Sequence, residues 1–296
     1  MADEIRTVGV LGCGLMGSGI AEVSARAGYR TIVLEADEAI LAAGLKKVQS
    51  SLGRAVERKR LAAEEAQQIT SRLSGTTRVE EVAPADIVVE AVVEDLAVKN
   101  QLFAALDPLC SERTLFASNT SSLTISAMAA ATQRPDRFVG LHFFNPVPIM
   151  KLVEVVRSVQ TSRESFERAF AFAKSLGKEP IACKDSSGFV VNLLLVPYIL
   201  GAIRAVERGV ASIEDIDKGM QLGCGHPMGP LTLLDFVGLD TTYRIAEIMF
   251  EEYKDPLYAA PPLLKRMVLA GFLGKKSGRG FYDYSGDKPV PSDLGI

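Results

Sequence analysis

A glycine-rich segment near the beginning of the chain constrains its fold more than any other feature. The apolar stretch TVGVL runs straight into GCGLMGSG, and a segment with helical periodicity, IAEVSARAG, follows. Gly12, Gly14 and Gly17 have the spacing G-x-G-x-x-G, which allows a tight turn, close approach of a pyrophosphate to the backbone, and close packing of helix on strand. The segment predicts a dinucleotide-binding loop that includes Leu15 and Met16. The alternative is a turn that only packs a helix on a strand.

The next apolar stretch, TIVLE, favours the dinucleotide-binding loop. It ends in Glu35, about 20 residues beyond the glycines, where an acidic side chain binds the ribose hydroxyls of a dinucleotide. A carboxylate at this position repels a 2′-phosphate, so we expect NAD rather than NADP as the cofactor. FAD would also fit such a loop, but no flavin signature accompanies it.

Short apolar stretches rich in β-branched residues alternate with helical patterns up to about residue 184. This alternation predicts an α/β fold, a Rossmann-type doubly wound and largely parallel sheet with helices on both faces. A charged helical stretch over about 37–73 is too long for a single crossover helix and indicates a helical insertion. Beyond DSSGF the strand signals stop. We therefore expect an NAD-binding domain over 1–187 and an all-helical (all-α) substrate and dimerisation domain over 188–296.

The overall composition narrows the classes of partner. The chain has 33 Lys and Arg against 36 Asp and Glu, a net charge of −3, which gives no indication of a nucleic-acid or membrane partner. Its four cysteines lack CxxC spacing, so neither a disulfide framework nor a zinc site is indicated. The longest apolar stretch contains Asn192 and Pro197 and is shorter than a membrane span. With a strand pattern in place of a signal peptide, we expect a soluble cytoplasmic protein.

Polar side chains follow several of the predicted strands, at the carboxyl ends where ligands bind in an open parallel sheet. They are Glu94 and Lys99 after VVEAVV, Asn119 and Ser121 after LFAS, and Asn145 after FVGLHFF. Because these ends meet at one edge of the sheet, we expect the side chains to surround one site.

His142 is one of only two histidines and lies within the apolar stretch FVGLHFFNP. Glu154 is the lone acid of the next strand, KLVEVV. A buried carboxylate beside an imidazole orients the ring and raises its basicity, which suits a general base. An isolated strand histidine is more often a packed structural residue, but the neighbouring acid and the dinucleotide loop favour the catalytic interpretation. The second histidine, His226, lies in a glycine- and proline-rich turn and is interpreted as structural.

Six segments taken in order resemble the L-3-hydroxyacyl-CoA dehydrogenase family over essentially the whole chain: GCGLMGSGIA, ASNTSSL, GLHFFNPVPIMKLVEVV, KDSSGFVVN, GHPMGP and GKKSGRGFY. The resemblance implies that His142 is the catalytic base with Glu154 as its partner, and that Ser121 and Asn192 are catalytic residues that contact the substrate. It also implies an NAD site that includes Glu35, Glu94, Lys99, Asn119, Ser121, Asn145 and Lys276. The helical insertion would bind coenzyme A, with Ser51 and Arg58 at the matching positions.

The same resemblance implies NAD-dependent oxidation of an L-3-hydroxyacyl-CoA, such as 3-hydroxybutyryl-CoA, to the 3-oxoacyl-CoA, and the reverse reduction. One alternative is a dehydrogenase of a free 3-hydroxy acid or sugar acid on the same fold, and another is a non-catalytic NAD-binding structural protein. The apolar faces of FVVNLLLVPYILGAIRAV and LTLLDFVGL exceed what the second domain buries within itself. We therefore expect a homodimer through the C-terminal helices, as the family resemblance also implies.

Overall fold

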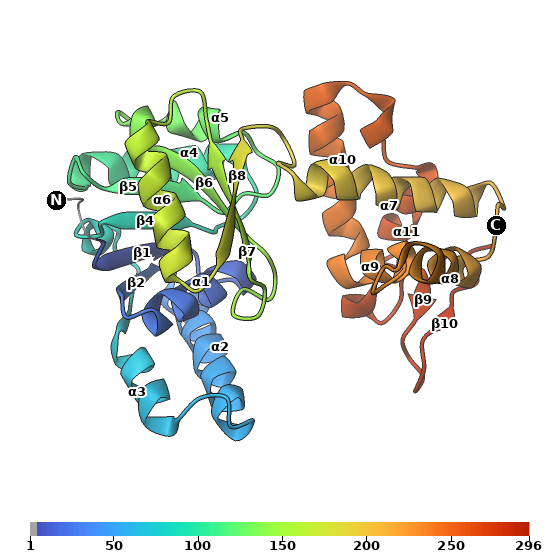
Figure 1. Ribbon diagram of the computed structural model, residues 1–296, viewed down its shortest axis with the longest axis horizontal. Helices are drawn as coiled ribbons and strands as arrows, with labels where there is room; N and C mark the ends of the chain where they lie inside the picture. The colour runs from blue at the N-terminus through green and yellow to red at the C-terminus, as the bar shows by residue number, and fades with distance from the viewer. Residues whose placement is uncertain (1–4, 296) are drawn as a thin grey trace. The chain divides into compact units, whose positions relative to one another are not determined.

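The computed structural model describes residues 5–295. The chain divides into two compact units, and the division falls between Phe189 and Val190, two residues beyond Ser187. The first unit is built on a single large sheet and the second is helical (Figure 1), which confirms the predicted fold class.

The first unit contains an eight-stranded sheet with the order β3-β2-β1-β4-β5-β6-β7-β8. The strands are β1 (Thr7–Leu11), β2 (Arg30–Leu34), β3 (Leu73–Thr76), β4 (Ile87–Glu90), β5 (Leu115–Ser118), β6 (Phe138–Phe143), β7 (Leu152–Arg157) and β8 (Glu179–Lys184). All neighbouring pairs are parallel except β6 and β7, which are antiparallel. The order of β1 to β6 is the one that binds dinucleotides where the strand order reverses, between β1 and β4.

The edge strand β3 is absent from the sequence-based prediction, which has the helical insertion continue to about Leu73. Its sequence, LSGT, lacks the apolar β-branched character of the other strands because Ser74 and Gly75 are exposed. It pairs with β2 alone, so it needs less apolar surface than a central strand.

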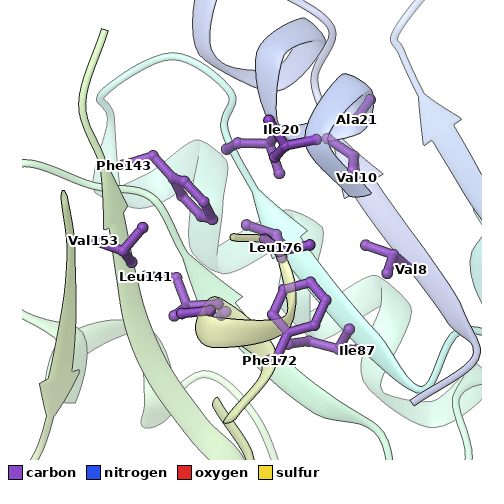
Figure 2. Packing of buried hydrophobic residues seen from close by; sticks show 14 of the residues in the cluster. Val8, Val10, Ile20, Ala21, Ile87, Leu141, Phe143, Val153, Phe172 and Leu176 are labelled. Atoms are coloured by element: carbon purple, nitrogen blue, oxygen red, sulfur yellow. The ribbon is translucent and has the colours of Figure 1, made fainter. Parts of the chain in front are cut away.

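Helices cover both faces of this sheet (Figure 1). They are α1 (Leu15–Arg26), α4 (Leu96–Leu106), α5 (Ile125–Ala129) and α6 (Arg163–Ser175), with 3₁₀ turns at η1 (Val79–Val82), η2 (Asp107–Leu109) and η3 (Pro135–Arg137). One apolar core joins the sheet to α1 and α6, and Figure 2 shows Ile20 from α1 and Phe172 from α6 within it. A second core on the opposite face contains Phe103 of α4 and Met128 of α5. Helices therefore pack on both faces of the sheet, and the loops that follow the strands lie at its carboxyl edge.

Two helices, α2 (Glu38–Glu57) and α3 (Ala63–Ser71), form the insertion between β2 and β3 and extend away from the sheet (Figure 1). The side chain of Asp37 starts α2 by accepting a hydrogen bond from the N–H of Ile40 at 2.8 Å. Val48 and Leu52 of α2 pack with Ile69 of α3 in a small separate core. The remaining faces are charged and exposed, so the pair forms an arm.

Within residues 190–295 the second unit contains five α-helices: α7 (Val191–Glu207), α8 (Ile213–Cys224), α9 (Pro230–Val237), α10 (Leu239–Tyr253) and α11 (Pro262–Leu269). Two 3₁₀ turns, η4 (Pro256–Tyr258) and η5 (Lys275–Ser277), accompany them. The structure adds a two-stranded ladder of β9 (Tyr282–Asp283) and β10 (Val290–Pro291) that an all-α prediction omits. Buried Asp235 fixes the start of this ladder, because its carboxylate accepts hydrogen bonds from the N–H groups of Phe281 and Tyr282, both at 2.8 Å.

Candidate active site

The glycine loop lies between β1 and α1, at the carboxyl edge of the sheet. Gly12 has φ +91°, and a Cβ there would lie 2.8 Å from the carbonyl oxygen of Ala91. A Cβ on Gly17 would lie 1.9 Å from the carbonyl oxygen of Gly12, so helix and strand pack without space for a side chain. By contrast, the Cβ position of Gly14 has no atom within 4 Å. Each glycine therefore has the property that a dinucleotide loop requires: a left-handed turn, an open approach and a close helix contact.

Glu35 follows the end of β2 and its carboxylate lies against this loop. One carboxylate oxygen, Oε1, accepts a hydrogen bond from the N–H of Cys13, between the first two glycines. The other, Oε2, accepts from the N–H of Ala36 at 3.1 Å. No side chain caps the first turn of α1, so its backbone N–H groups and the positive end of the helix dipole can receive a phosphate. The loop and the acid fit a dinucleotide.

His142 and Glu154 form a buried pair on adjacent strands. They are direct partners in the antiparallel register of β6 and β7, and Nδ1 of His142 lies 2.6 Å from Oε2 of Glu154. Glu154 is fully buried and His142 is 6% exposed. When Nδ1 carries the ring proton and donates it to the carboxylate, Nε2 is left as an unprotonated acceptor. The pair therefore has the geometry of a general base held in one tautomer.

The surroundings of this pair are mainly apolar. The ring of His142 lies close to the rings of Phe144 and Phe189, with centroid separations of 4.5 and 5.6 Å. On the far side of Glu154, Sγ of Cys183 in β8 lies 4.0 Å from Oε1. Burial, together with the negative charge of Glu154, raises the pKa of the Cys183 thiol to about 12. The sulfur is therefore protonated at neutral pH and can act only as a weak donor to the carboxylate.

The loop after β5 reaches the same edge of the sheet. Oδ1 of Asn119 accepts a hydrogen bond from the N–H of Phe143 at 2.9 Å, which ties this loop to the end of β6. Ser121 follows in the same turn, and its N–H donates to Oε1 of Glu94 at 3.1 Å. Ser122 is held from the other side, because its carbonyl oxygen accepts from the hydroxyl of Ser187 at 2.8 Å. The predicted residues Glu94, Asn119 and Ser121 thus lie together with His142.

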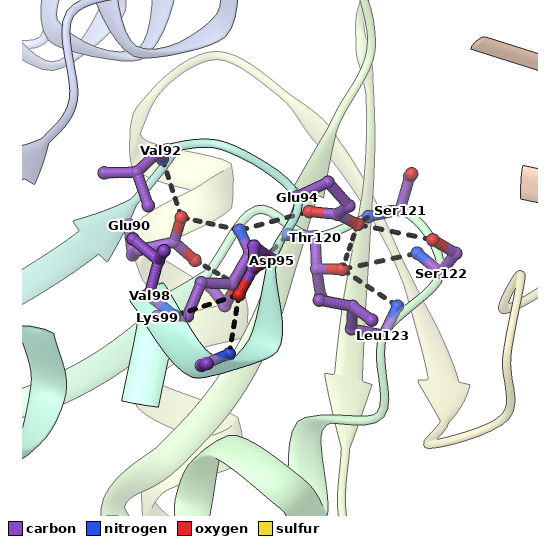
Figure 3. A network of polar contacts seen from close by, with 12 residues as sticks. Glu90, Val92, Glu94, Asp95, Val98, Lys99, Thr120, Ser121, Ser122 and Leu123 are labelled. Atoms are coloured by element: carbon purple, nitrogen blue, oxygen red, sulfur yellow. Dashed lines mark hydrogen bonds and ion pairs between the residues drawn. The ribbon is translucent and has the colours of Figure 1, made fainter. Parts of the chain in front are cut away.

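A buried ionic network connects this turn to β4 (Figure 3). Nζ of Lys99, in α4, lies 2.6 Å from Oε1 of Glu90 and 3.1 Å from Oε2 of Glu94. Burial acts against the charge of Glu94, but Lys99 and the hydrogen bonds from Thr120 and Ser121 outweigh it and hold the pKa of Glu94 below its ordinary value. We call Glu90, Glu94 and Lys99 the β4 network.

Two residues of this region are not predicted from the sequence. Glu90 is fully buried at the end of β4, and the single acid that ends the apolar stretch DIVVE is the signal that could have found it. Lys178 precedes β8, and its buried ammonium donates to the carbonyl oxygens of Val147 and Met150. It thereby holds the loop that contains Asn145. The periodicity of the sequence does not predict that Lys178 is buried or that it binds these two carbonyl oxygens.

The remaining predicted residues lie elsewhere. Ser51 is half-buried on α2, and Arg58 is exposed at the end of that helix, next to Lys59 and Arg60. Asn192 and Lys276 belong to the second unit, where Lys276 forms an ion pair with Asp240 at 2.6 Å.

The second histidine also lies in that unit, with Nδ1 of His226 3.0 Å from the hydroxyl of Tyr198. No helix among residues 5–295 has both the length and the apolar character needed to cross a bilayer.

An open glycine loop and a buried imidazole–carboxylate pair at one edge of a parallel sheet define the class of protein: an NAD-dependent oxidoreductase. The model of the 3-hydroxyacyl-CoA dehydrogenase NAD binding domain matches residues 7–186, and that of the C-terminal domain of 3-hydroxyacyl-CoA dehydrogenase matches residues 188–284. The chain belongs to the 3-hydroxyacyl-CoA dehydrogenase family.

Three relatives illustrate the similarity. A 3-hydroxybutyryl-CoA dehydrogenase of Mycobacterium tuberculosis is 53% identical over 286 residues, which cover 96% of this chain and 100% of the relative. The mitochondrial hydroxyacyl-coenzyme A dehydrogenase of Homo sapiens is 48% identical over 95% of this chain and 91% of its own length. The crystal structure of (S)-3-hydroxybutyryl-CoA dehydrogenase PaaH1 from Ralstonia eutropha superposes with a TM-score of 0.92 at 43% identity, covering 96% and 100% of the two chains.

Proposed function

We propose that the protein oxidises short L-3-hydroxyacyl-CoA esters, such as 3-hydroxybutyryl-CoA, to 3-oxoacyl-CoA with NAD, and catalyses the reverse reduction. The observation that carries the proposal is the pair of His142 and Glu154, joined by a 2.6 Å contact and fixed by strand register. The family membership and the names of the similar proteins support the substrate class.

His142 is the general base of the proposed reaction. NAD, when bound at the glycine loop, supplies the acceptor for the hydride that leaves C3 of the substrate. Nε2 of His142 takes the proton of the 3-hydroxyl group, and the ring becomes an imidazolium. Glu154 stabilises that cation because its carboxylate is already bound to Nδ1. In the reverse direction the same imidazolium returns the proton to the oxygen at C3.

Other residues bind and orient the reactants in this proposal. The hydroxyl of Ser121 contacts the reacting oxygen, and Asn192 orients the thioester end of the substrate. The loop residues Gly12, Gly14, Leu15, Met16 and Gly17 hold the cofactor phosphates, and Glu35 binds the adenosine ribose. Glu94, Lys99, Asn119, Asn145 and Lys276 complete the cofactor site. Apolar side chains around His142 keep the reacting groups away from water.

Ser51 and Arg58 on the arm bind coenzyme A in this proposal. Arg58 lies in an exposed cluster with Arg54, Lys59 and Arg60 at the end of α2, where guanidinium and ammonium groups can receive phosphates. This cluster favours a CoA ester over a free 3-hydroxy acid. Rates of NADH oxidation with acetoacetyl-CoA and with free acetoacetate separate the two, because a free-acid dehydrogenase would prefer the second.

The substitution His142→Gln tests the proposed reaction. We expect turnover of acetoacetyl-CoA to fall by about 10²- to 10⁴-fold, the usual contribution of a positioned acid–base group, with NADH affinity nearly unchanged. His226→Gln is the matched control, since it removes the only other histidine and should leave turnover close to that of the wild type. Near-normal turnover of the His142 variant would refute the assignment.

The proposed assembly is a homodimer through the C-terminal helices, in the cytoplasm. Large apolar side chains on the second unit support the dimer: Leu194 is 69% exposed, and Leu222 and Leu269 are each 78% exposed. Light scattering coupled to size-exclusion chromatography gives the mass directly. A monomer of 31.8 kDa at micromolar concentration would contradict the dimer. The four cysteines are all free, which fits the reducing cytoplasm.

A further inference from the structure

The topology of the sheet separates the two halves of the cofactor. In this strand order a dinucleotide lies across the point where the order reverses, with one half over each side of the sheet. Glu35, the proposed ribose ligand, follows β2 on one side of β1, so the nicotinamide half would lie over β4, β5 and β6 on the other. Glu94, Ser121 and His142 all lie at that end of the sheet. The β4 network therefore faces the nicotinamide half, a placement that rests on the proposed function.

Hydrogen bonding in the network favours an ionised Glu90. Oε1 of Glu90 accepts from Nζ of Lys99 at 2.6 Å and from the N–H of Val92 at 2.7 Å. Oε2 accepts from the hydroxyl of Ser118 at 2.6 Å. That hydroxyl already accepts from the N–H of Thr120 at 3.2 Å, so its proton points at Glu90. Burial raises the pKa of Glu90, and these three donors act in the opposite direction because each of them stabilises the carboxylate.

Glu94 is ionised for similar reasons. Its Oε1 accepts from the hydroxyl of Thr120 at 2.5 Å and from the N–H of Ser121 at 3.1 Å. Lys99 is 1% exposed and has one ammonium to share between the two carboxylates. The β4 network thus consists of two negative charges and one positive charge. Asp95, which caps α4 at the surface, is a further carboxylate and not a cation.

We propose that the β4 network holds one net negative charge beside the nicotinamide and thereby strengthens the binding of oxidised NAD relative to NADH. The oxidised ring carries a positive charge and the reduced ring is neutral, so a nearby fixed anion stabilises only the oxidised form. The low dielectric of the buried network preserves the effect, because water does not screen Glu90 or Lys99. Glu90 is a positioning residue in this scheme, since it acts through Lys99 and the field and touches no reactant.

The ratio of the dissociation constants of NAD and NADH tests this inference. Both constants are measured by isothermal titration calorimetry on the full-length protein without an acyl-CoA. For Glu90→Gln we expect the constant for NAD to rise by about fivefold or more and that for NADH to change by less than about twofold. If Glu90 were only a structural residue, its loss would weaken the binding of NAD and NADH equally. Equal changes, or no change in the ratio, would overturn the inference.

Two further variants keep the test decisive. Asp107→Asn is the matched control, because Asp107 is also a buried carboxylate paired with a cation, Arg134, but lies beyond the opposite end of α4. The ratio of the NAD and NADH dissociation constants should not change in this variant. If Glu90→Gln does not fold, as thermal melting will show, Glu94→Gln at the more exposed end of the network replaces it. Because Glu94 also belongs to the proposed cofactor site, the expected result for this variant is the same rise in the ratio of the NAD constant to the NADH constant. These measurements need no turnover. Near-normal turnover of His142→Gln would refute the proposed reaction, but the ratio of the NAD and NADH dissociation constants would still test the role of the β4 network.

Discussion

Gly44 of α2 lies directly against Cys13 of the glycine loop. A Cβ on Gly44 would come within 2.4 Å of Sγ and 2.5 Å of the carbonyl oxygen of Cys13. The arm therefore packs on the glycine loop through a contact that has no space for a methyl group. This contact joins the first half of α2 to the glycine loop, while Arg58 lies at the other end of the same helix.

Gly44→Ala should weaken NADH binding. The new methyl group must displace either α2 or the glycine loop, and such overpacking typically costs about 1–3 kcal/mol. Fluorescence titration with NADH measures the loss. Gly53→Ala is the matched control, because its Cβ position in the same helix has no atom within 4 Å and alanine favours a helix over glycine. Unchanged affinity and melting temperature in the Gly44 variant would show that the contact is loose.

Glu154→Gln should reduce kcat by about 10²-fold or more while leaving NADH affinity nearly unchanged. The neutral amide cannot stabilise the imidazolium, and its NH₂ group can favour the wrong tautomer of His142. Steady-state kinetics with acetoacetyl-CoA and NADH provide the measurement. Glu167→Gln on α6 removes a carboxylate that is 59% exposed and should have no effect. Activity within about threefold of the wild type would mean that Glu154 has only a packing role.

Arg58→Glu tests the CoA-binding role of the arm. Reversal of a charge that meets a phosphate should raise the KM for acetoacetyl-CoA by about tenfold or more, because charge-assisted hydrogen bonds are lost and repulsion is introduced. A pantetheine thioester lacks the nucleotide phosphates, so its KM should be unchanged. Equal effects on both substrates would instead indicate that the substitution disturbs the arm itself.

Glu94 should make the stability of the protein depend on pH in acid. Because its pKa in the folded state lies below the ordinary value, the unfolded chain takes up the proton first as the pH falls. The stabilisation that Glu94 contributes is therefore complete above its ordinary pKa and is lost as the pH falls through the folded-state value. Urea unfolding of the wild type and Glu94→Gln at pH 7 down to pH 3.5 measures the difference between them. A difference that stays constant, or grows in acid, would contradict the assignment.

The sequence predicts most of the fold because β1, β2 and β4 to β7 are almost entirely buried and therefore read as continuous apolar stretches. The edge strand β8 is largely exposed but still contains the apolar stretch PIAC. Seven of the eight strands of the large sheet fall on such stretches. The edge strand β3 does not, since solvent on one side permits Ser74 and Gly75. Likewise, the two-residue strands β9 and β10 are defined by contacts with Asp235 and by their mutual pairing, which periodicity does not encode.

The candidate site is predictable where an ionisable residue interrupts an apolar stretch, as His142 and Glu154 do. Their mutual pairing also follows from adjacency, since consecutive strands joined by a short loop often pair. The β4 network is different. Glu90 and Lys99 come from different elements, and only the packing of α4 on the sheet shows that one ammonium serves two carboxylates. Lys178 likewise needs the three-dimensional course of the loop at 144–151 to reveal its role.

The antiparallel pairing of β6 and β7 makes the candidate site sensitive to a shift in strand register. Because β7 is antiparallel, His142 and Glu154 face each other across one hairpin that is contiguous in sequence. A slip of one residue in β7 would turn Glu154 to the opposite face of the sheet and carry Val153 or Val155 to the histidine. The proposed catalytic pair would then be lost with almost no change in composition or overall fold. A one-residue insertion or deletion within β6 or β7 would therefore separate His142 from Glu154.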